Sequence, residues 1–216
     1  MKQKAGFLFG LMLVLFLCSP LLRAQTGKSL PLPAPQTGGG RPLMQVLSDR
    51  KSTREFGPGT LSPQTLSNLL WAAFGINRPD GRRTAPSAMN WQEVSIYVVT
   101  PEGVYIYDAQ ANALDFVIAG DRRASTGTQS FVKDAAVNLV YVADLAKTGG
   151  VESSDAQLYT AADVGFIAQN VYLYCASEGL VTVVRGSIDR VALSKTLNLG
   201  TQQKIILAQS VGYLKK

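Results

Sequence analysis

The sequence contains no histidine and only two cysteines, Cys18 and Cys175. Without histidine the chain cannot build a Ser-His-Asp or Cys-His nucleophile relay, a two-histidine zinc helix or a histidine proton shuttle. Two cysteines are too few for a disulfide framework or a thiolate zinc site. If the protein is an enzyme, we therefore expect its reactive chemistry to come from a bound cofactor.

Charged residues are also scarce, at 17% of the 216 residues, against ~25% in an average globular protein. This scarcity argues against a charge-rich disordered chain. With 46% hydrophobic residues, the chain is long enough to bury a core of its own in one domain or two small ones. Nothing repeats at a fixed period, which excludes solenoids and propellers.

Residues 1–24 have the features of a secretory signal peptide. Lys2 and Lys4 precede an apolar run over residues 7–17, and the small residue Ala24 follows. The run is shorter than the ~20 residues of a membrane span. We expect cleavage after Ala24, a periplasmic or secreted mature protein, and no stable membrane span once the signal is removed. An uncleaved anchor, or a lipoprotein attached through Cys18, is the alternative.

Cleavage would also lower the positive charge. It would remove three of the 21 basic residues and none of the 15 acidic ones, so the net charge would fall from +6 to +3. The remainder has no Lys/Arg cluster with interleaved aromatic residues, and nucleic-acid binding is therefore not expected. A small anionic ligand needs only two or three well-placed cations, which this balance allows.

Proline and glycine dominate residues 25–42, which include four prolines and the run Gly38-Gly39-Gly40. The composition predicts a linker that is too poor in apolar residues to pack. The globular domain is then expected over residues 43–216.

Hydrophobic spacing in this domain predicts an α+β fold. Ser62 and Pro63 are typical of the start of a helix, whose apolar residues continue to Gly75. Strands are expected over 94–100 and 103–108, joined as a hairpin, and then over 136–143, 181–184 and 204–213, with a helix capped by Ser187 over 187–198. Because the later strands come singly between helices, an α+β fold is favoured over a doubly wound parallel sheet.

A long helix is expected over residues 155–178, ended by Gly179. Its apolar residues, among them Val164, Phe166 and Val171, surround most of its circumference. A helix that is apolar on all sides is buried. The partner is either the core or a second subunit.

Residues 50–56 (Arg-Lys-Ser-Thr-Arg-Glu-Phe) follow a short helical stretch over 43–49. Three cations and two hydroxyls within five residues can converge on a phosphate, because guanidinium and hydroxyl donors satisfy several oxygens together. The same composition is typical of a solvated basic turn.

A second segment, residues 85–92 (Ala-Pro-Ser-Ala-Met-Asn-Trp-Gln), directly precedes a predicted strand. Pro86 and Ser87 favour a turn, so the Asn90 amide could point into a cleft at the edge of the sheet. An amide both donates and accepts, which suits the edge of a flavin or a pyrimidine. The alternative is that Asn90 only caps local backbone.

Taken together, these segments resemble the FMN-dependent nitroreductase family. The family opens with an Arg-Arg-Ser-x-Arg-x-Phe type of sequence, matched at 50–56, and later carries Pro-Ser-(Ser/Ala)-x-Asn-x-Gln, matched at 86–92. The resemblance continues through Asp163-x-Gly165, Gln169-Asn170, Gly179-Leu180 and Val211-Gly212-Tyr213, and covers residues 43–216. It implies an antiparallel sheet core flanked by helices, and an interlocked homodimer with FMN at the subunit interface.

The resemblance also implies roles for residues of the first motif. Arg50 and Ser52 would bind the FMN phosphate, and Lys51 belongs to the same cofactor-binding motif. Arg54 would reach the ribityl chain or the pyrimidine oxygen near N1, where a cation stabilises an anionic reduced flavin. A C-terminal cation, Lys216 or Lys215, would close the phosphate site.

Other parts of the chain would contact the ring. Asn90 would hydrogen-bond the pyrimidine edge, with Pro86 and Ser87 in the supporting loop. Arg185 and Gly186 stand where the family places backbone N–H groups against N5 and O4. Here the family often has Pro-x-Glu-Gly, whereas this chain has Val183-Val184-Arg185-Gly186. The resemblance therefore predicts a charge of reversed sign beside N5.

We interpret the sequence as an exported FMN-dependent oxidoreductase of the nitroreductase type. Hydride would pass from a reduced donor such as NAD(P)H to an electron-poor acceptor such as a nitroaromatic or a quinone. The flavin would carry the chemistry, with no catalytic side chain and no metal. Two alternatives remain: a non-catalytic flavin-binding protein, and a flavin dehydrogenase that oxidises a peptide or ring substrate.

Export is directly testable. Expressed with its own N-terminus in a bacterium, the protein should accumulate in the periplasm, and N-terminal sequencing should start near Gln25. Full-length protein confined to the cytosol would contradict the signal-peptide interpretation.

Overall fold

The structure is a computed structural model that describes residues 29–148 and 154–216, so the predicted signal peptide lies outside the described residues. Within these ranges, the strands form one sheet in the order β1-β5-β4-β3-β6-β8-β2, and β7 also pairs with β8. All pairings are antiparallel. The strands are β1 (Ser29–Pro31), β2 (Phe56–Gly57), β3 (Val94–Val99), β4 (Gly103–Asp108), β5 (Ala113–Ala119), β6 (Val137–Asp144), β7 (Val181–Arg185) and β8 (Gln203–Leu214).

Four α-helices are described: α1 (Leu43–Asp49), α2 (Pro63–Phe74), α3 (Ser154–Glu178) and α4 (Arg190–Thr196). Short 3₁₀ turns are η1 (Ala88–Asn90), η2 (Arg123–Thr126), η3 (Ser130–Lys133) and η4 (Leu145–Thr148). The predicted start of α2 is confirmed, because the Ser62 side chain accepts a hydrogen bond from the Thr65 backbone N–H and Pro63 is the first helical residue.

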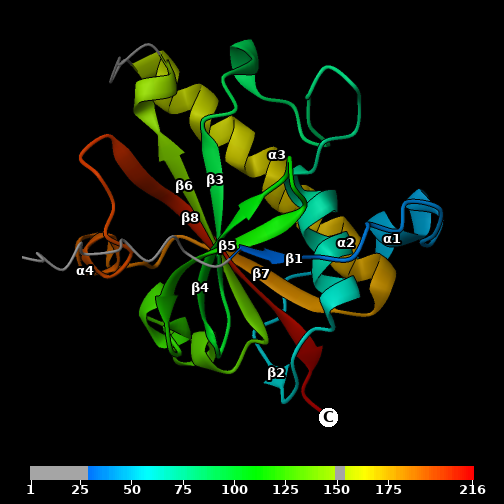
Figure 1. Cartoon of the computed structure of the whole chain (residues 1–216). Coiled ribbons are helices and arrows are strands. Elements are labelled where there is room, and N and C mark those ends of the chain that lie inside the picture. The colour runs from blue at the N-terminus through cyan, green and yellow to red at the C-terminus, as the bar shows by residue number, and fades with distance from the viewer. Residues whose placement is uncertain (1–28, 149–153) are drawn as a thin grey trace, which may run out of the picture.

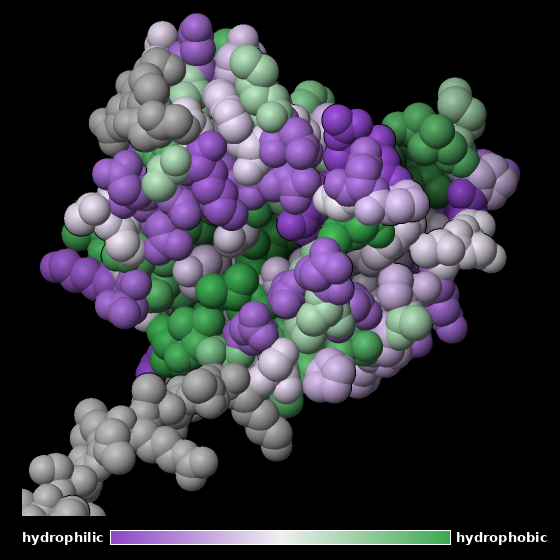
Figure 2. Space-filling model, turned by 45° about the horizontal axis from the view of Figure 1, so that its top comes forward, coloured by the Kyte–Doolittle hydropathy of each residue, from purple (hydrophilic) through white to green (hydrophobic). Residues whose placement is uncertain are grey.

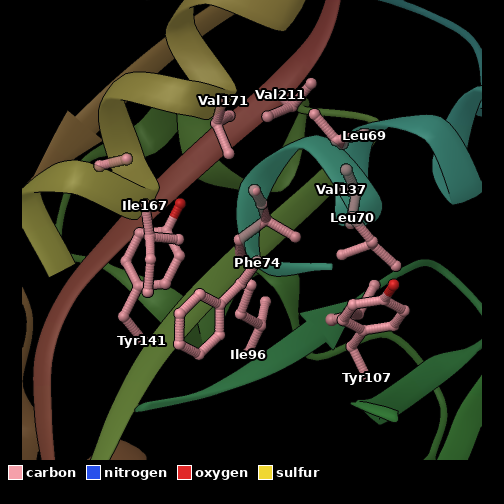
Figure 3. Packing of buried hydrophobic residues seen from close by; sticks show 14 of the residues in the cluster. Leu69, Leu70, Phe74, Ile96, Tyr107, Val137, Tyr141, Ile167, Val171 and Val211 are labelled. Carbon is pink, nitrogen blue, oxygen red and sulfur yellow. The ribbon is translucent and has the colours of Figure 1, made fainter. Parts of the chain in front are cut away.

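The sheet is the middle of three layers (Figure 1). Helices α2 and α3 pack on one face and α4 packs on the other. Alternate residues of β3 divide between the faces, as strand geometry requires: Ile96 joins the α2/α3 core and Tyr97 joins the α4 core. Figure 3 shows Leu69, Leu70 and Phe74 of α2 beside Ile167 and Val171 of α3, over the strand residues Ile96, Tyr107, Val137 and Tyr141.

This architecture confirms the α+β expectation and the 94–108 hairpin. Strands β1, β2 and β5 were not predicted. The helix expected from Ser187 starts later, because Asp189 is the residue that caps α4 by accepting from the Ala192 N–H. The long helix over 155–178 and the final strand are confirmed to within one residue at each end.

The predicted linker is wrong for its described part, residues 29–42. Strand β1 pairs with β5, with Ser29 opposite Asp115. The Asn112 amide and the Ser67 hydroxyl both donate to the Pro33 carbonyl. Proline lacks an N–H but keeps an acceptor, so a proline-rich segment can be fixed to a domain by donors from that domain.

Helix α3 buries one face more completely than the other. Val164, Ile167 and Val171 are 0% exposed within the core of the same chain. Leu158, Tyr159 and Phe166 are exposed by 65%, 44% and 47%. The apolar residues of this helix thus lie on two faces. One face packs in the core of the same chain, and the face with Leu158, Tyr159 and Phe166 is open to a partner. No helix among the described residues is both long and apolar enough to cross a membrane.

The two faces of α3 should respond differently to the same substitution. Val171→Asp would bury an unpaired carboxylate, which costs several kcal/mol against a total stability of roughly 5–15 kcal/mol. We expect this variant not to fold. Phe166→Asp, the matched control on the exposed face, should keep the circular-dichroism spectrum of the native fold. A well-folded Val171→Asp variant would contradict this packing.

Candidate functional site

The loop 50–56 lies against the ends of two strands. Its Thr53 N–H donates to the Thr182 carbonyl of β7 over 3.0 Å. At its far end, β2 pairs with the end of β8, with Phe56 opposite Leu214. Long-range backbone contacts therefore fix this basic segment at both ends, unlike a free solvated turn.

Tyr172 of α3 links this loop to β7. Its hydroxyl accepts the Val184 N–H over 2.9 Å and lies 2.8 Å from the Ser52 hydroxyl oxygen. The Arg50 guanidinium carbon lies 5.2 Å from the centroid of the Tyr172 ring, a cation–π geometry. When Tyr172 donates to Ser52, the proton of the Ser52 hydroxyl is free for an outside acceptor.

Positive charge gathers around this loop. Arg50 is half-buried, and Lys51 and Arg54 are exposed. Lys215 and Lys216 follow β8, and the Lys215 N–H donates to the Glu55 carbonyl at 3.4 Å. Across residues 29–148 and 154–216, salt bridges join Arg41 to Asp49, Arg82 to Asp80 and Arg123 to Asp121, and none involves the cations of this cluster. The cluster suits a phosphate, which accepts several charge-assisted hydrogen bonds at once.

Arg185, by contrast, is turned into the protein. Its side chain is buried and donates to the Thr126 carbonyl, the Asn138 amide oxygen and the Ser210 hydroxyl oxygen at 2.5–3.0 Å. Burial lowers the pKa of this guanidinium to about 10, which still leaves it charged at neutral pH. The positive charge that the resemblance puts beside N5 thus belongs to a side chain directed into the protein, and the exposed element here is the backbone of Gly186.

Gly127 is required by this buried arginine. A Cβ atom at Gly127 would collide with an Arg185 guanidinium nitrogen and would crowd the Ser187 carbonyl at 3.2 Å. The segment around η2 can therefore pack against the Arg185 guanidinium only because residue 127 is a glycine.

The second predicted segment, residues 86–92, forms a strained turn. Met89, Asn90 and Gln92 adopt positive φ values of 51°, 55° and 47°, which L-residues seldom adopt. Inside the turn, Ser87 Oγ accepts the Gln92 N–H at 2.9 Å. Such a conformation persists when its surroundings over-determine it, as happens often at functional sites.

A chain of side chains orients Asn90. Arg83 Nε donates to Gln92 Oε1 at 2.8 Å, and Gln92 Nε2 donates to Asn90 Oδ1 at 3.1 Å. Asn90 is exposed, so its amide NH₂ is presented outward as a donor. The guanidinium fixes the order of donors and acceptors along this chain, because arginine can only donate.

Beneath this turn lie two buried carboxyl groups, Glu93 and Asp163, which are 0% and 2% exposed. Glu93 accepts from the Ser87 hydroxyl at 3.3 Å, and Asp163 accepts from the Ala88 N–H at 2.9 Å. Burial raises the pKa of both groups, and the nearby Asp163 charge raises that of Glu93 further.

The two predicted segments contact α3 at different heights. The first reaches Tyr172 and the second reaches Asp163, nine residues apart and thus about 13.5 Å along the helix axis. Within the described residues, no hydrogen bond, ion pair or ring contact joins residues 50–56 to residues 86–92. One chain therefore carries the two motifs as separate half-sites.

Open cavities lie along the surface of the described residues, and one of about 660 Å³ adjoins the end of the basic loop at Phe56 and Lys215. Another, of about 460 Å³, adjoins the turn and is lined by Arg78, Arg82, Arg83, Pro86, Ser87 and Asn90, among others. A further cavity, of about 720 Å³, lies between the start of α3, α4 and the start of β8. Its lining includes Val191, Ile205 and Ile206 with the cations Arg190, Lys195 and Lys204.

The three-layer α+β fold is a feature that this chain shares with known proteins. The sequence model described as "Nitroreductase family" matches residues 47–213. A candidate nitroreductase of Methanocaldococcus jannaschii is 33% identical over 155 residues, which are 67% of this chain and 78% of that protein. The chain belongs to the nitroreductase family.

Solved structures agree with this assignment. The crystal structure of a candidate nitroreductase from Ralstonia eutropha superposes with a TM-score of 0.84 at 40% identity, covering 89% of this chain and 92% of the other. The NADPH:FMN oxidoreductase of Vibrio harveyi, solved with NAD⁺, gives 0.61 at 20% identity, covering 81% and 69%. At 20% identity, the match to the Vibrio harveyi protein shows a shared fold alone. The family places this chain among the oxidoreductases, which in this family are generally FMN-dependent.

Sequence reasoning missed Tyr172, Arg83 and Glu93. Tyr172 and Glu93 lie in patterns typical of a buried helix and of the start of a strand, and their contacts come from distant segments. The available signal was weak: Glu93 is an acid directly before a predicted apolar strand, and Tyr172 is one of three tyrosines in a helix expected to be buried.

Tyr172→Phe tests the link between loop and sheet. The ring would stay beneath Arg50, but the Val184 N–H and Ser52 would lose their shared partner, at a cost of about 1–3 kcal/mol. We expect lower stability in denaturant unfolding and faster hydrogen exchange at Val184 and Thr53. Tyr174→Phe, on the same helix, is the control and should leave both amides unchanged. Equal exchange rates in wild type and Tyr172→Phe would show that the link is not structural.

Proposed function

We propose that this protein is an FMN-dependent oxidoreductase that acts as a homodimer. It would take hydride from NAD(P)H or a similar donor and reduce an electron-poor acceptor such as a nitroaromatic or a quinone. The observation that carries the proposal is the cationic cluster around Ser52, whose charges have no acidic partner among the described residues. It lies beside the exposed backbone at the end of β7.

The residues present fit FMN. Arg50, Ser52 and the C-terminal lysines would hold the phosphate, and Arg54 would extend the positive charge toward the ring. Gly186 would offer its backbone N–H, and it has no side chain to obstruct a ligand. Its surroundings are open, because a Cβ atom added there would meet only Leu207 at 3.7 Å. When bound, FMN supplies a ring that accepts a hydride from one substrate and yields it to another. No side-chain nucleophile is needed, in agreement with the absence of histidine.

The homodimer is supported by the separation of the half-sites. The turn of Asn90 and the Ser52 cluster contact α3 at Asp163 and Tyr172, about 13.5 Å apart along the helix axis, and a second copy could bring its own turn to that cluster. Apolar side chains are also left open, on α1 (Leu43, Met44, Leu47) and on α3 (Leu158, Tyr159, Phe166). Figure 2 shows hydrophobic surface gathered over α1 at the right edge of the molecule. Exposed apolar surface of this extent is typical of an interface.

An anionic donor is supported by the arginines beside Asn90. Arg78, Arg82 and Arg83 line the 460 Å³ cavity next to the turn that would meet the ring. Guanidinium groups bind phosphates in a bidentate way, as the phosphates of NAD(P)H would require. Export of the mature chain, from residue 25 onward, remains part of the proposal.

Titration of FMN into the refolded apoprotein tests the assignment. We expect one FMN per subunit and a yellow protein. Arg50→Ala should weaken binding about ten- to a hundredfold, because charge-assisted hydrogen bonds contribute roughly 1.5–3 kcal/mol each. The exposed Arg122→Ala is the matched control and should bind like the wild type. Phe166→Asp should give a folded monomer with weakened FMN binding.

The outcomes distinguish the alternatives. A colourless protein that fails to bind FMN would overturn the assignment. A protein that binds FMN but is reduced by neither NADH nor NADPH under anaerobic conditions would fit the non-catalytic flavin-binding alternative.

A further inference from the structure

Glu93 and Asp163 form an acidic pair in the interior without a cation. Glu93 directly precedes β3 and Asp163 lies in α3, on the side that faces the sheet. No lysine or arginine forms a salt bridge with either carboxylate within residues 29–148 and 154–216. Two adjacent carboxylates removed from water cannot both remain ionised at low cost.

The contacts of the pair indicate a shared proton. The two carboxyl groups accept from adjacent residues of one turn, Ser87 and Ala88, and the Asp163 charge raises the pKa of Glu93. Two buried carboxyl groups at such close range ionise together only at high cost, so one proton is expected to stay on the pair. In addition, Glu93 Oε1 is buried and has no hydrogen-bond partner among the described atoms. Burial without a hydrogen-bond partner costs more free energy for an ionised oxygen than for a protonated carboxyl group.

The pair also anchors the strained turn. The Ser87 hydroxyl donates to Glu93 and the Ala88 N–H donates to Asp163, at 3.3 and 2.9 Å. The three left-handed residues follow at once, at 89, 90 and 92. The two carboxyl groups thus tie the start of the turn to the sheet and to α3.

We propose that Glu93 and Asp163 hold one proton between them and act as positioning residues for the turn that presents Asn90. With the proton in place, the pair accepts from both Ser87 and Ala88 and the turn is held. With the proton lost, two adjacent buried negative charges repel each other and the turn is released. That Asn90 contacts a bound ring rests on the proposed function. The shared proton and its effect on the turn are independent of that function.

The charged side chains near Glu93 and Asp163 do not neutralise the negative charge of the pair. Lys147 Nζ donates to the Gln92 carbonyl and Arg83 donates to the Gln92 side chain, so both cations act on the turn and not on the pair. The Asp144 N–H donates to the Glu93 carbonyl, while the Asp144 side chain accepts from the Ala146 N–H. Lys147, Arg83 and Asp144 therefore each have a partner outside the pair.

The sign of the pH effect follows from the raised pKa values. A carboxyl group whose pKa is higher in the folded state binds its proton more tightly there than in the unfolded chain. The contribution of the pair to folding stability is therefore greatest at acidic pH, and it falls as pH rises from the ordinary pKa of 4.5 for Glu93 toward the raised pKa. Glu93→Gln mimics the protonated carboxyl group, because its NH₂ donates to Asp163 and its oxygen accepts from Ser87.

The experiment follows the fluorescence of Trp91, which lies in the turn with its ring centroid 6.2 Å from that of Tyr159. It uses the FMN-free protein with Trp71→Phe, so that one tryptophan reports. We expect emission to change as pH rises through the pKa of the pair, and we expect Glu93→Gln to abolish that change and keep the low-pH spectrum. Asp144→Asn, a neighbouring carboxylate, is the control and should titrate like the parent.

A parent protein with no transition, or a Glu93→Gln variant that titrates like the parent, would overturn the proposal. If Glu93→Gln does not fold, the stability of the wild type against denaturant decides: a loss on raising the pH supports the shared proton and a constant value contradicts it. In the FMN-bound protein, affinity should fall over the same pH range in wild type but not in Glu93→Gln. Failure to bind FMN at all would refute the proposed function and leave the fluorescence result standing.

Discussion

The packing of α3 against the sheet fixes the position of both functional segments. Its buried face carries Val164, Ile167 and Val171 into the core, and the same helix carries Asp163 and Tyr172. Because the apolar residues set the rotation and height of the helix, they also set where its two polar contacts meet the turn and the basic loop. The hydrophobic core thus determines the spacing of the half-sites, and a shift of one helical turn would move both by about 5.4 Å.

Buried polar groups also determine which segments pack on the two faces of the sheet. Arg185 gathers Thr126, Asn138 and Ser210 from three separate segments. On the α2/α3 side, the Gln209 amide accepts from Tyr141 and donates to Thr182 and to the Ala168 carbonyl. A buried polar group without partners is costly, so each of these groups disfavours alternative packings in which its partners are absent.

Local signals predicted the parts of the fold that depend on neighbours in sequence. Ser62 and Pro63 start α2 through contacts within one turn, and the 94–108 hairpin closes across a short connection. The sequence could not show that residues 29–33 pair with the domain, because their donors, Asn112 and Ser67, are remote. It could not show either that the Arg185 side chain points inward, since that direction depends on partners at 126, 138 and 210. The basic loop and the turn were found by motif, but their distance along α3 required the structure.

Cofactor binding and self-association are linked in the proposed homodimer. Arg50, Lys51 and Arg54 repel one another when no anion is present, and the apolar side chains of α1 and α3 are exposed when no second copy is present. An anion at the cluster and a partner at the apolar surface each favour the state that the other requires, because one bound ring would contact both chains. A ligand that binds only the assembled state stabilises it in proportion to the logarithm of its concentration over its dissociation constant. The division of the motifs between two half-sites would therefore make an isolated subunit a weak flavin binder, and the bound cofactor would stabilise the interface.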